Sequence, residues 1–378
     1  MAKPTVTVLI DTCNHERFIE EAIVTVLEQD FPRSEMEVIV VDDGSTDRTP
    51  DIVRKFESRL RLIRKPNGGQ ASAFNAGIPE AQGEIVAFLD GDDWWARNKL
   101  TRVAEAMAAD PSVGIVGHGI IMVHRDGREQ SEILREGFRF QADTAEGARL
   151  FRLRRSFLGT SRMTIRAGLL RRIGPVPEAL VVEADEYLFT LAASLAGGQV
   201  LPDALTYYRY HDANAFQISN GDPSKLRRKQ ESLAALAQSL SEQLERHSVP
   251  PEAYRCITEI VQAEAAQSRL ALHGGKPFET LLAEWKIYDV HSPQVGFLHR
   301  MLKCLRLLPA AFLPPRTYYR WRGRFAEGRK YREVRNRWLP DPPRQHVHNE
   351  WRSASQISRP ISADESQKRE RGLPPCKS

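Results

Sequence analysis

Cysteine is scarce in this sequence, and no long hydrophobic run occurs in it. The chain of 378 residues has only four cysteines, and they show no paired spacing: Cys13, Cys256, Cys304 and Cys376. Such scattered thiols argue against a disulfide framework or a structural zinc site and favour a reducing compartment. No window holds the roughly 18 apolar residues of a membrane-spanning helix, and no secretory signal precedes the first predicted strand. We therefore expect a cytoplasmic protein.

Two further absences narrow the class of protein. No G-x-G-x-x-G follows the first predicted strand, which argues against a dinucleotide-dependent dehydrogenase. No nucleic-acid-binding module is recognisable, so we expect no nucleic-acid partner. Hydrophobic residues make up 41% of the chain and charged residues 27%, which is the balance of a soluble globular protein with one or two domains.

The positive charge of the chain is concentrated near its C-terminal end. The net charge is +5, yet residues 296–345 contain 13 Lys or Arg against 3 Asp or Glu. Residues 346–378 contain 6 against 4, so residues 1–295 are net negative, at −7. The basic character therefore belongs to one local surface and not to the whole protein.

Predicted strands and helices alternate through the first hundred residues. Apolar runs of strand length lie at 6–10, 36–41, 60–63 and 84–89, and helical patterns lie between them at 16–29, 49–58 and 70–81. This alternation predicts an α/β fold with a mostly parallel, Rossmann-like sheet flanked by helices. In such a sheet, ligands bind beyond the carboxyl ends of the strands.

Acidic residues follow three of these predicted strands. They are Asp11 after the first strand, Asp42 and Asp43 after the second, and Asp90, Asp92 and Asp93 after the fourth. Close carboxylates repel one another unless a cation lies among them. The cluster therefore predicts a site for a hard divalent ion, Mn²⁺ or Mg²⁺, together with the phosphates of a substrate.

Four ordered sequence elements resemble those of the inverting glycosyltransferases of family 2, which have the GT-A fold. The family's opening strand and turn corresponds to residues 8–14, and its V-D-D-G-S-T-D element is present unaltered at 41–47. Its N-x-G…A-x-N-x-G segment matches residues 67–77, and the element that ends in D-x-D-D matches residues 81–93. Three positions depart from the family pattern, with Asp11 in place of a proline, Cys13 in place of an aromatic residue and Phe74 in place of an arginine.

The resemblance implies a metal-dependent inverting transfer of a sugar from a nucleoside-diphosphate sugar, with UDP expected as the nucleotide. The acceptor would be a hydroxyl of a saccharide or of a lipid-linked molecule, in the synthesis of cell-surface polysaccharide or glycoconjugate. Metal binding is implied for Asp90 and Asp92, with His211 of a Y-R-x-H element as a further ligand. Contacts to the nucleotide sugar are implied for Thr12, Asn14, Asp42, Asp43, Asn67, Gly69, Asn75, Asp90 and Arg209.

The general base of the transfer is expected near residue 185. Family members carry a glutamate and, seven residues later, the last residue of an acidic pair at the start of a helix, and Glu178 and Asp185 have that spacing. An inverting displacement needs such a carboxylate, because a base must remove the proton of the attacking hydroxyl. We therefore predict Asp185 as the base, although Ala184 stands where the other acid of the pair is expected. Glu183 and Glu186 remain alternatives, and Asp185 could instead only cap a helix.

We expect four segments along the chain. They are a GT-A catalytic domain at 1–221, a helical appendage at 222–295, a basic amphipathic helical segment at 296–339 and a disordered tail at 340–378. The catalytic domain would have a nucleotide-sugar half at 1–110 and an acceptor half at 111–221. In the acceptor half, residues 128–160 are expected to be irregular, and residues 212–221 to form a loop over the donor.

Residues 297–325 mix apolar and aromatic side chains with Arg and Lys, which suits an anionic membrane surface on the cytoplasmic side. Docking of this segment on the appendage, or a contact in a homodimer, remains an alternative. For the whole chain, the alternatives are a catalytically degenerate family member that serves as a binding module, and a nucleotidyltransferase.

Overall fold

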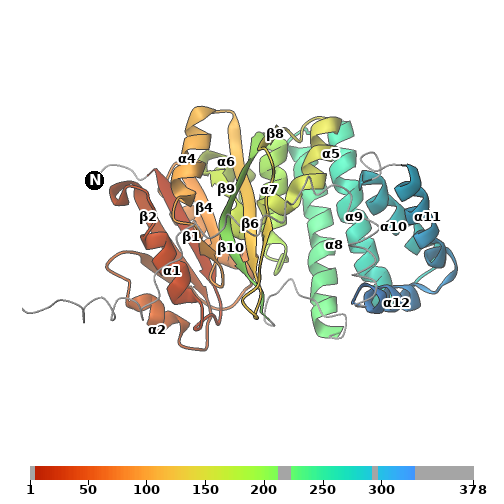
Figure 1. The fold of residues 1–378 in the computed structure, drawn as a ribbon, viewed down its shortest axis with the longest axis horizontal. Coiled ribbons are helices and arrows are strands. Elements are labelled where there is room, and N and C mark those ends of the chain that lie inside the picture. The colour runs from red at the N-terminus through yellow and green to blue at the C-terminus, as the bar shows by residue number, and fades with distance from the viewer. Residues whose placement is uncertain (1–4, 212–222, 292–296, 328–378) are drawn as a thin grey trace, which may run out of the picture.

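The computed structural model of the chain describes residues 5–211, 223–291 and 297–327. The loop expected at 212–221 and the tail expected at 340–378 lie outside the described residues. Figure 1 shows a sheet with helices on both of its faces and, beyond it, a region built of helices alone.

A ten-stranded mixed sheet forms the centre of the fold, and its main path runs in the order β3-β2-β1-β4-β9-β6-β10-β5. One end of this path is parallel and consists of β1 (Val6–Thr12), β2 (Met36–Asp43), β3 (Arg61–Lys65) and β4 (Ile85–Asp90). Beyond β4 follow the antiparallel β9 (Thr164–Arg166), then the parallel pair β6 (Val113–Val123) and β10 (Gly197–Arg209), and last the antiparallel β5 (Trp94–Trp95). The predicted α/β sheet is confirmed.

Helices cover both faces of the parallel strands, so successive side chains of a strand enter two different cores. Leu9 of β1 packs in the same buried cluster as residues of α3 (Gln70–Gly77), α6 (Ala167–Ile173) and α7 (Ala184–Leu195). Its neighbour Ile10 packs in the cluster of α1 (Ile19–Leu27), α2 (Thr49–Arg54) and α4 (Lys99–Ala109). Burial on both sides explains why these strands read as continuous apolar runs.

The expectation of an irregular segment at 128–160 is wrong. The segment contains β7 (Glu129–Glu132), which pairs with β6, β8 (Phe138–Phe140), which pairs with β10, and α5 (Ala145–Arg154). The side chain of Thr144 caps α5 by accepting a hydrogen bond from the Gly147 N–H at 3.0 Å. Strands of three or four residues are too short to show a periodicity, and their partners on the sheet define them instead.

The Y-R-x-H element lies at the end of a long strand, because β10 begins at Gly197 and ends at Arg209. Register shifts between Leu201 and Ala204 interrupt its pairing with β6. A bulge of this kind interrupts the alternation of inward and outward side chains along a strand. The first part of β10 therefore lacks the sequence pattern by which a strand is predicted.

The helical region follows the sheet directly. It consists of α8 (Pro223–Arg246), α9 (Pro251–His273), α10 (Pro277–His291), α11 (Phe297–Phe312) and α12 (Pro315–Glu327). Leu236 and Leu240 of α8 and Ile257 of α9 are fully buried in the same cluster as Leu9 and Phe88 of the sheet. Among the described helices, none combines the length and the apolar character that crossing a membrane requires.

Candidate active site

The register of the parallel strands brings their acidic ends together. Asp11 of β1 lies opposite Asp90 of β4, and Thr12 of β1 lies opposite Asp42 of β2. Burial is the main cause that raises the pKa of Asp11 and of Asp90, and the charge of Asp185, at the start of α7, is close enough to add to both shifts. The predicted acids of β1, β2 and β4 therefore share one edge of the sheet with the predicted base.

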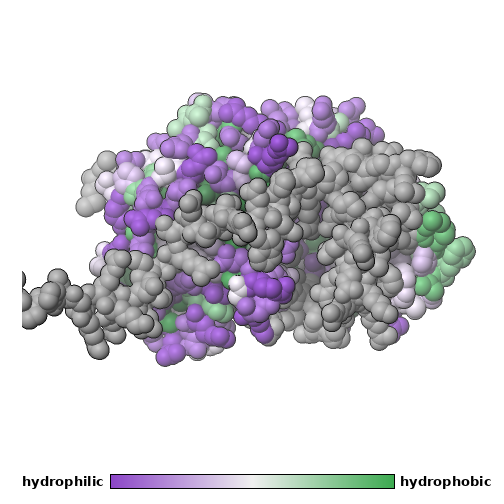
Figure 2. All heavy atoms as spheres, in the orientation of Figure 1, coloured by the Kyte–Doolittle hydropathy of each residue, from purple (hydrophilic) through white to green (hydrophobic). Residues whose placement is uncertain are grey.

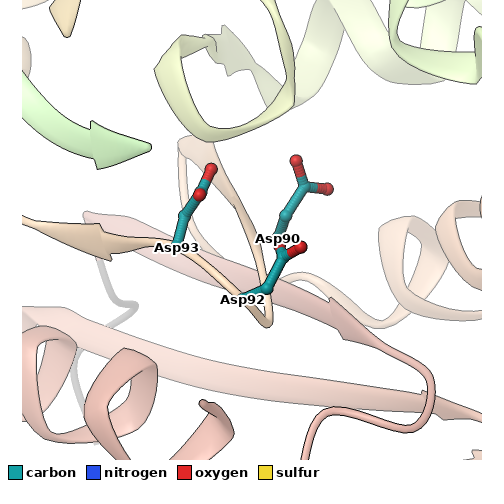
Figure 3. A group of neighbouring side chains, drawn as sticks. All are labelled: Asp90, Asp92 and Asp93. Carbon is teal, nitrogen blue, oxygen red and sulfur yellow. The ribbon is translucent and has the colours of Figure 1, made fainter. Parts of the chain in front are cut away.

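The turn after β4 presents three carboxylates as a group. Asp90, Asp92 and Asp93 each offer an oxygen, and these oxygens lie within 4.8 Å of one another. Figure 3 shows the three side chains leaving the turn on the same side. Asp93 was not among the predicted metal ligands, and it accepts a hydrogen bond from the Arg209 N–H at 3.0 Å through its Oδ1.

Burial and mutual repulsion oppose ionisation of most of these acids. Burial, together with the charges of Asp11 and Asp92, raises the pKa of Asp90 well above its ordinary value. Burial and the charge of Asp92 raise the pKa of Asp93 to about 8. Burial alone would raise the pKa of Asp92 as well. The hydrogen bond from His211 and the charge of the nearby His15 have the larger effect, and they hold the pKa of Asp92 below its ordinary value.

This donor set fits a divalent cation. Oδ1 of Asp11 and Oδ2 of Asp93 are buried and have no hydrogen-bond partner within the described part of the chain. Buried polar atoms without a partner are rare in proteins and often mark the place of an ion or a water. Clustered carboxylate oxygens are the ligands that Mg²⁺ and Mn²⁺ prefer.

Two histidines flank Asp92. Nε2 of His211 lies 2.8 Å from Asp92 Oδ2, so β10 returns the predicted third ligand to the turn after β4. His15, which the sequence analysis missed, has its Nε2 3.9 Å from the same oxygen and its Nδ1 3.2 Å from the Thr12 hydroxyl. The ring of Phe18 lies against His211, with 4.8 Å between the ring centroids.

Asp43 organises the loop at 67–69, which lies next to the end of β2. Its carboxylate accepts hydrogen bonds from the Gly68 N–H at 3.0 Å, the Gly69 N–H at 2.7 Å and the Lys65 ammonium at 2.7 Å. The side chain of Asn67 donates to the Asp43 carbonyl oxygen at 2.9 Å. Gly69 has φ +82°, and a Cβ there would lie 2.7 Å from Val181, so the loop requires glycine at this position.

Asp42 and Asn14 fix the neighbouring turn. Asp42 is fully buried, accepts from the Ser45 N–H at 3.0 Å and pairs with Arg64 at 2.9 Å. Asn14 has φ +57°, a left-handed conformation that asparagine tolerates well, and its side chain accepts from the Thr46 N–H at 2.8 Å.

Other predicted donor contacts have partners within the protein. The side-chain amide of Asn75 hydrogen-bonds both the carbonyl and the N–H of Val176, at 2.7 and 2.8 Å, and so ties α3 to the segment before Asp185. The Arg209 guanidinium lies over the rings of Phe18 and Trp94 and donates to the Asp92 carbonyl oxygen. Asn75 and Arg209 therefore stabilise the backbone around the acidic edge of the sheet. Their contact with a nucleotide sugar stays a prediction.

One departure from the family pattern has a structural explanation. Phe74, where the family often has arginine, is fully buried, and its ring meets that of Phe88 edge to face at 5.2 Å. The side chain serves the core beneath the site and supplies no contact to a phosphate.

The three candidate bases have different surroundings. Burial and the charge of Glu186 raise the pKa of Asp185. Glu186, although buried, is held as a carboxylate by Arg155 and Arg152, which lower its pKa. Burial, Glu186 and Asp185 raise the pKa of Glu183 to about 8, and this residue has φ +67°.

Asp185 therefore fits the base better than its neighbours do. Glu186 is engaged in ion pairs, with Arg152 at 3.0 Å, and a paired carboxylate is a weak proton acceptor. The carboxyl of Glu183 has Lys229 of α8 3.9 Å away. Asp185 also accepts from the N–H of Glu186 at 2.8 Å, as a carboxylate at the start of a helix would, so that capping and catalysis are compatible.

Thr160 and Ser161 are neighbours in the chain and contact both groups of acids, which the sequence analysis did not predict. Oδ2 of Asp185 lies 3.2 Å from the N–H and 3.3 Å from the hydroxyl of Thr160. The Ser161 hydroxyl lies 3.3 Å from Asp90 Oδ2 and 3.1 Å from the Asp90 N–H. Its carbonyl oxygen accepts from the buried Lys99 ammonium at 2.7 Å. The only signal in the sequence is a short Gly-Thr-Ser run, which belongs to no catalytic motif.

The comparisons with known proteins agree with this geometry. Residues 7–171 match the sequence model described as Glycosyl transferase family 2. An uncharacterised glycosyltransferase of Nostoc sp. is 33% identical over 216 residues, which cover 55% of this chain and 66% of the relative. The poly(ribitol-phosphate) beta-N-acetylglucosaminyltransferase TarS of Staphylococcus aureus is 29% identical over 208 residues, which cover 53% of this chain and 35% of TarS.

The fold has a solved counterpart in the mannosyltransferase PcManGT of Pyrobaculum calidifontis, a structure described as a complex with GDP-Man and Mn²⁺. The likeness has a TM-score of 0.50 at 24% identity and covers 90% of this chain and 89% of that chain. The strand order of the sheet and the likeness to this structure thus show the GT-A fold of a glycosyltransferase. Residues 7–171 are a glycosyl transferase family 2 domain. The chain spans 66% and 35% of the lengths of the two curated relatives named above.

Proposed function

We propose that the protein is a metal-dependent, inverting glycosyltransferase that moves a sugar from a nucleoside-diphosphate sugar, UDP-linked, to a hydroxyl acceptor. The observation that carries this proposal is the meeting of the acids of β1, β2 and β4 with Asp185 at one edge of a family 2 domain. Ligands of such sheets bind at that edge.

The residues of the site would have three tasks, which are to bind the metal ion, to bind the nucleoside and to act as the base. Asp90 and Asp92, with Asp93 and His211 beside them, would hold the divalent ion, which when bound stabilises the charge that develops on the departing diphosphate. The edge formed by Thr12, Asp42 and the Asp43-ordered loop would hold the nucleoside, and the sugar would lie between this edge and Asp185.

Asp185 would act on the acceptor. As the acceptor oxygen forms its bond to the anomeric carbon, the bond from that carbon to the diphosphate oxygen breaks, and the acceptor's proton passes to the Asp185 carboxylate. A single displacement of this kind inverts the anomeric centre. Thr160, which donates to Oδ2 of Asp185, would keep this carboxylate aimed at the acceptor.

Two observations support finer points of the proposal. The printed name of the S. aureus relative describes transfer of N-acetylglucosamine to poly(ribitol-phosphate), which supports a cell-surface polymer, or its saccharide or lipid-linked precursor, as the acceptor. Cys13, Cys256 and Cys304 are free thiols, which suits a cytoplasmic location.

The test is a product assay. The full chain is incubated with a panel of nucleoside-diphosphate sugars and Mn²⁺, and the products are identified by mass spectrometry. Release of a nucleoside diphosphate, with the sugar on water or an acceptor, supports the proposal. A parallel incubation contains nucleoside triphosphates and sugar 1-phosphates, and release of pyrophosphate with formation of a nucleoside-diphosphate sugar there would identify a nucleotidyltransferase instead. Binding of donors without turnover in either incubation would identify a binding module.

Two variants assign the roles of the acids. We expect Asp92→Asn to remove the Mn²⁺-dependent part of nucleotide binding in calorimetry, because Asp92 would be a principal ligand of the ion. We expect Asp185→Asn to bind the donor normally but to turn over about 10²-fold more slowly, the scale of general-base catalysis. Full activity in Asp185→Asn with a loss in Glu186→Gln or Glu183→Gln would transfer the base role to that neighbour.

A further inference from the structure

The helices farthest from the sheet expose an apolar stripe. Met301, Leu305, Leu308 and Phe312 of α11 are 44%, 53%, 52% and 78% exposed. Their spacing of four, three and four residues places them on one face of the helix, one above the other. Helices of globular proteins usually turn such a face inward, so this stripe indicates a surface that contacts something beyond the described chain.

The neighbouring helix repeats the pattern. Phe278, Leu282 and Trp285 of α10 are also exposed, again at a spacing of four and three residues. α10 packs directly against α11, and α12 adds the exposed Trp321. Figure 2 shows hydrophobic residues at the end of the molecule where Figure 1 places α11.

The charge of this segment identifies the class of partner. Residues 297–325 contain seven Lys or Arg and no Asp or Glu, and with α10 included residues 277–325 still contain eight Lys or Arg against three Asp or Glu. Arg316 and Arg320 of α12 are exposed. A partner that covers the apolar face must therefore tolerate, or supply, a high density of negative charge nearby.

Two other occupants fit this charge poorly. A second copy of the chain would bring a segment with the same excess of Lys and Arg, so a symmetric contact between the two segments would join regions of like charge. The rest of the same chain, residues 328–378, carries 12 Lys or Arg against 6 Asp or Glu and is also net positive. An anionic bilayer meets both requirements, because its headgroups attract the Lys and Arg side chains while its acyl region receives apolar and aromatic ones.

We propose that the apolar face of α10 and α11, which belongs to a segment rich in Arg and Lys, binds the surface of an anionic lipid bilayer. The helices would lie in the interface and would not cross it. This surface lies at the far end of the helical region from the sheet (Figure 1), so the acidic edge of the sheet stays free of the bilayer. The inference does not depend on the proposed sugar transfer.

The experiment is co-sedimentation of the full chain with vesicles of phosphatidylcholine alone and of phosphatidylcholine with phosphatidylglycerol. We expect binding to the anionic vesicles, weakened at high salt. The double variant Leu305→Glu and Leu308→Glu should lose binding by at least about tenfold, because it puts two negative charges into the stripe. The matched control is Ala234→Glu with Gln238→Glu, which places two negative charges on the exposed face of α8 and should bind like the wild type.

Light scattering and thermal unfolding accompany the assay, so that a loss of binding can be separated from a loss of folding. Absence of wild-type binding to any vesicle would overturn the proposal, as would equal binding by the stripe variant and the control. A dimer in solution that the stripe variant converts to monomers, without vesicle binding, would assign the face to a second copy of the chain and also overturn it.

Discussion

At the scale of single residues, the acids of this site have different roles because their surroundings differ. Asp92 is held ionised by His211 and His15, whereas burial and neighbouring acids raise the pKa of Asp90 and Asp93. Within the described part of the chain, Asp185 has no cationic partner as close as those of Glu186, and donors of Thr160 and Glu186 stabilise it instead. A carboxylate with a raised pKa is a stronger proton acceptor once it has ionised, which suits a general base.

This environment predicts a pH dependence. A base works only in its ionised form, so activity should fall as the pH decreases through the pKa of Asp185, and burial places this fall above the ordinary aspartate range. Thr160 donates to the carboxylate and lowers that pKa. In Thr160→Val the acid limb of the pH profile of kcat should therefore move to higher pH.

Thr164→Val is the control for this measurement. Thr164 is also buried, and its hydroxyl has no hydrogen-bond partner within the described residues, so its removal should leave the acid limb in place. Thr160→Ser, which keeps the hydroxyl, should restore the wild-type profile. Identical acid limbs in Thr160→Val and the wild type would show that Thr160 does not act on the base.

At the scale of elements, α5 links the base to the helical region. Arg152 of α5 is fully buried at its side chain and pairs with Glu186 of α7 at 3.0 Å and with Glu264 of α9 at 3.8 Å. Arg155 makes ion pairs with the same two glutamates. The start of α7, which carries Asp185, is therefore held from the side of α9 as well as from the sheet.

Removal of the buried arginine should be costly. In Arg152→Ala two glutamates lose a partner in a buried place, and breaking buried pairs of this kind typically costs about 3–5 kcal/mol. We expect a loss of about 3 kcal/mol in the free energy of unfolding, measured with urea. Arg149→Ala removes an exposed arginine of the same helix and should change the stability by less than about 0.5 kcal/mol. Similar values for the two variants would mean that the ion pairs contribute little.

At the scale of the whole molecule, the sheet and the first two helices of the helical region share one core. Leu236 and Leu240 of α8 belong to the buried cluster that contains Leu9 and Phe88 of the sheet. The boundary drawn at residue 221 from composition is therefore a change of architecture, and the hydrophobic core continues across it.

A shared core predicts cooperative unfolding. Leu240→Ala removes a fully buried side chain of α8 and should cost about 2–5 kcal/mol. Because the core is common, amide hydrogen exchange under native conditions should accelerate in β1 as well as in α8. Ala234→Gly, at an exposed position of α8, should cost only about 1 kcal/mol. Faster exchange in α8 with unchanged exchange in β1 would show two separate folding units.

The sequence by itself determined the strands of the first half and the acids that end them. Val and Ile runs form buried strands, the helices between them make the strands parallel, and parallel strands carry their ends to one edge. That edge gathers Asp11, Asp42 and Asp90 without any information about distant contacts. The family elements added the expected positions of His211 and Asp185.

The tertiary structure alone decided which neighbours each acid has. The bonds from Asn75 to Val176 and from Ser161 to Asp90 join residues 101 and 71 positions apart, and no periodicity reports such contacts. The same holds for Arg209, whose guanidinium lies between Phe18 and Trp94, and for the arginines that hold Glu186. Local pattern sets where an acid leaves its strand, whereas its pKa and its orientation depend on side chains that only the complete packing brings within reach.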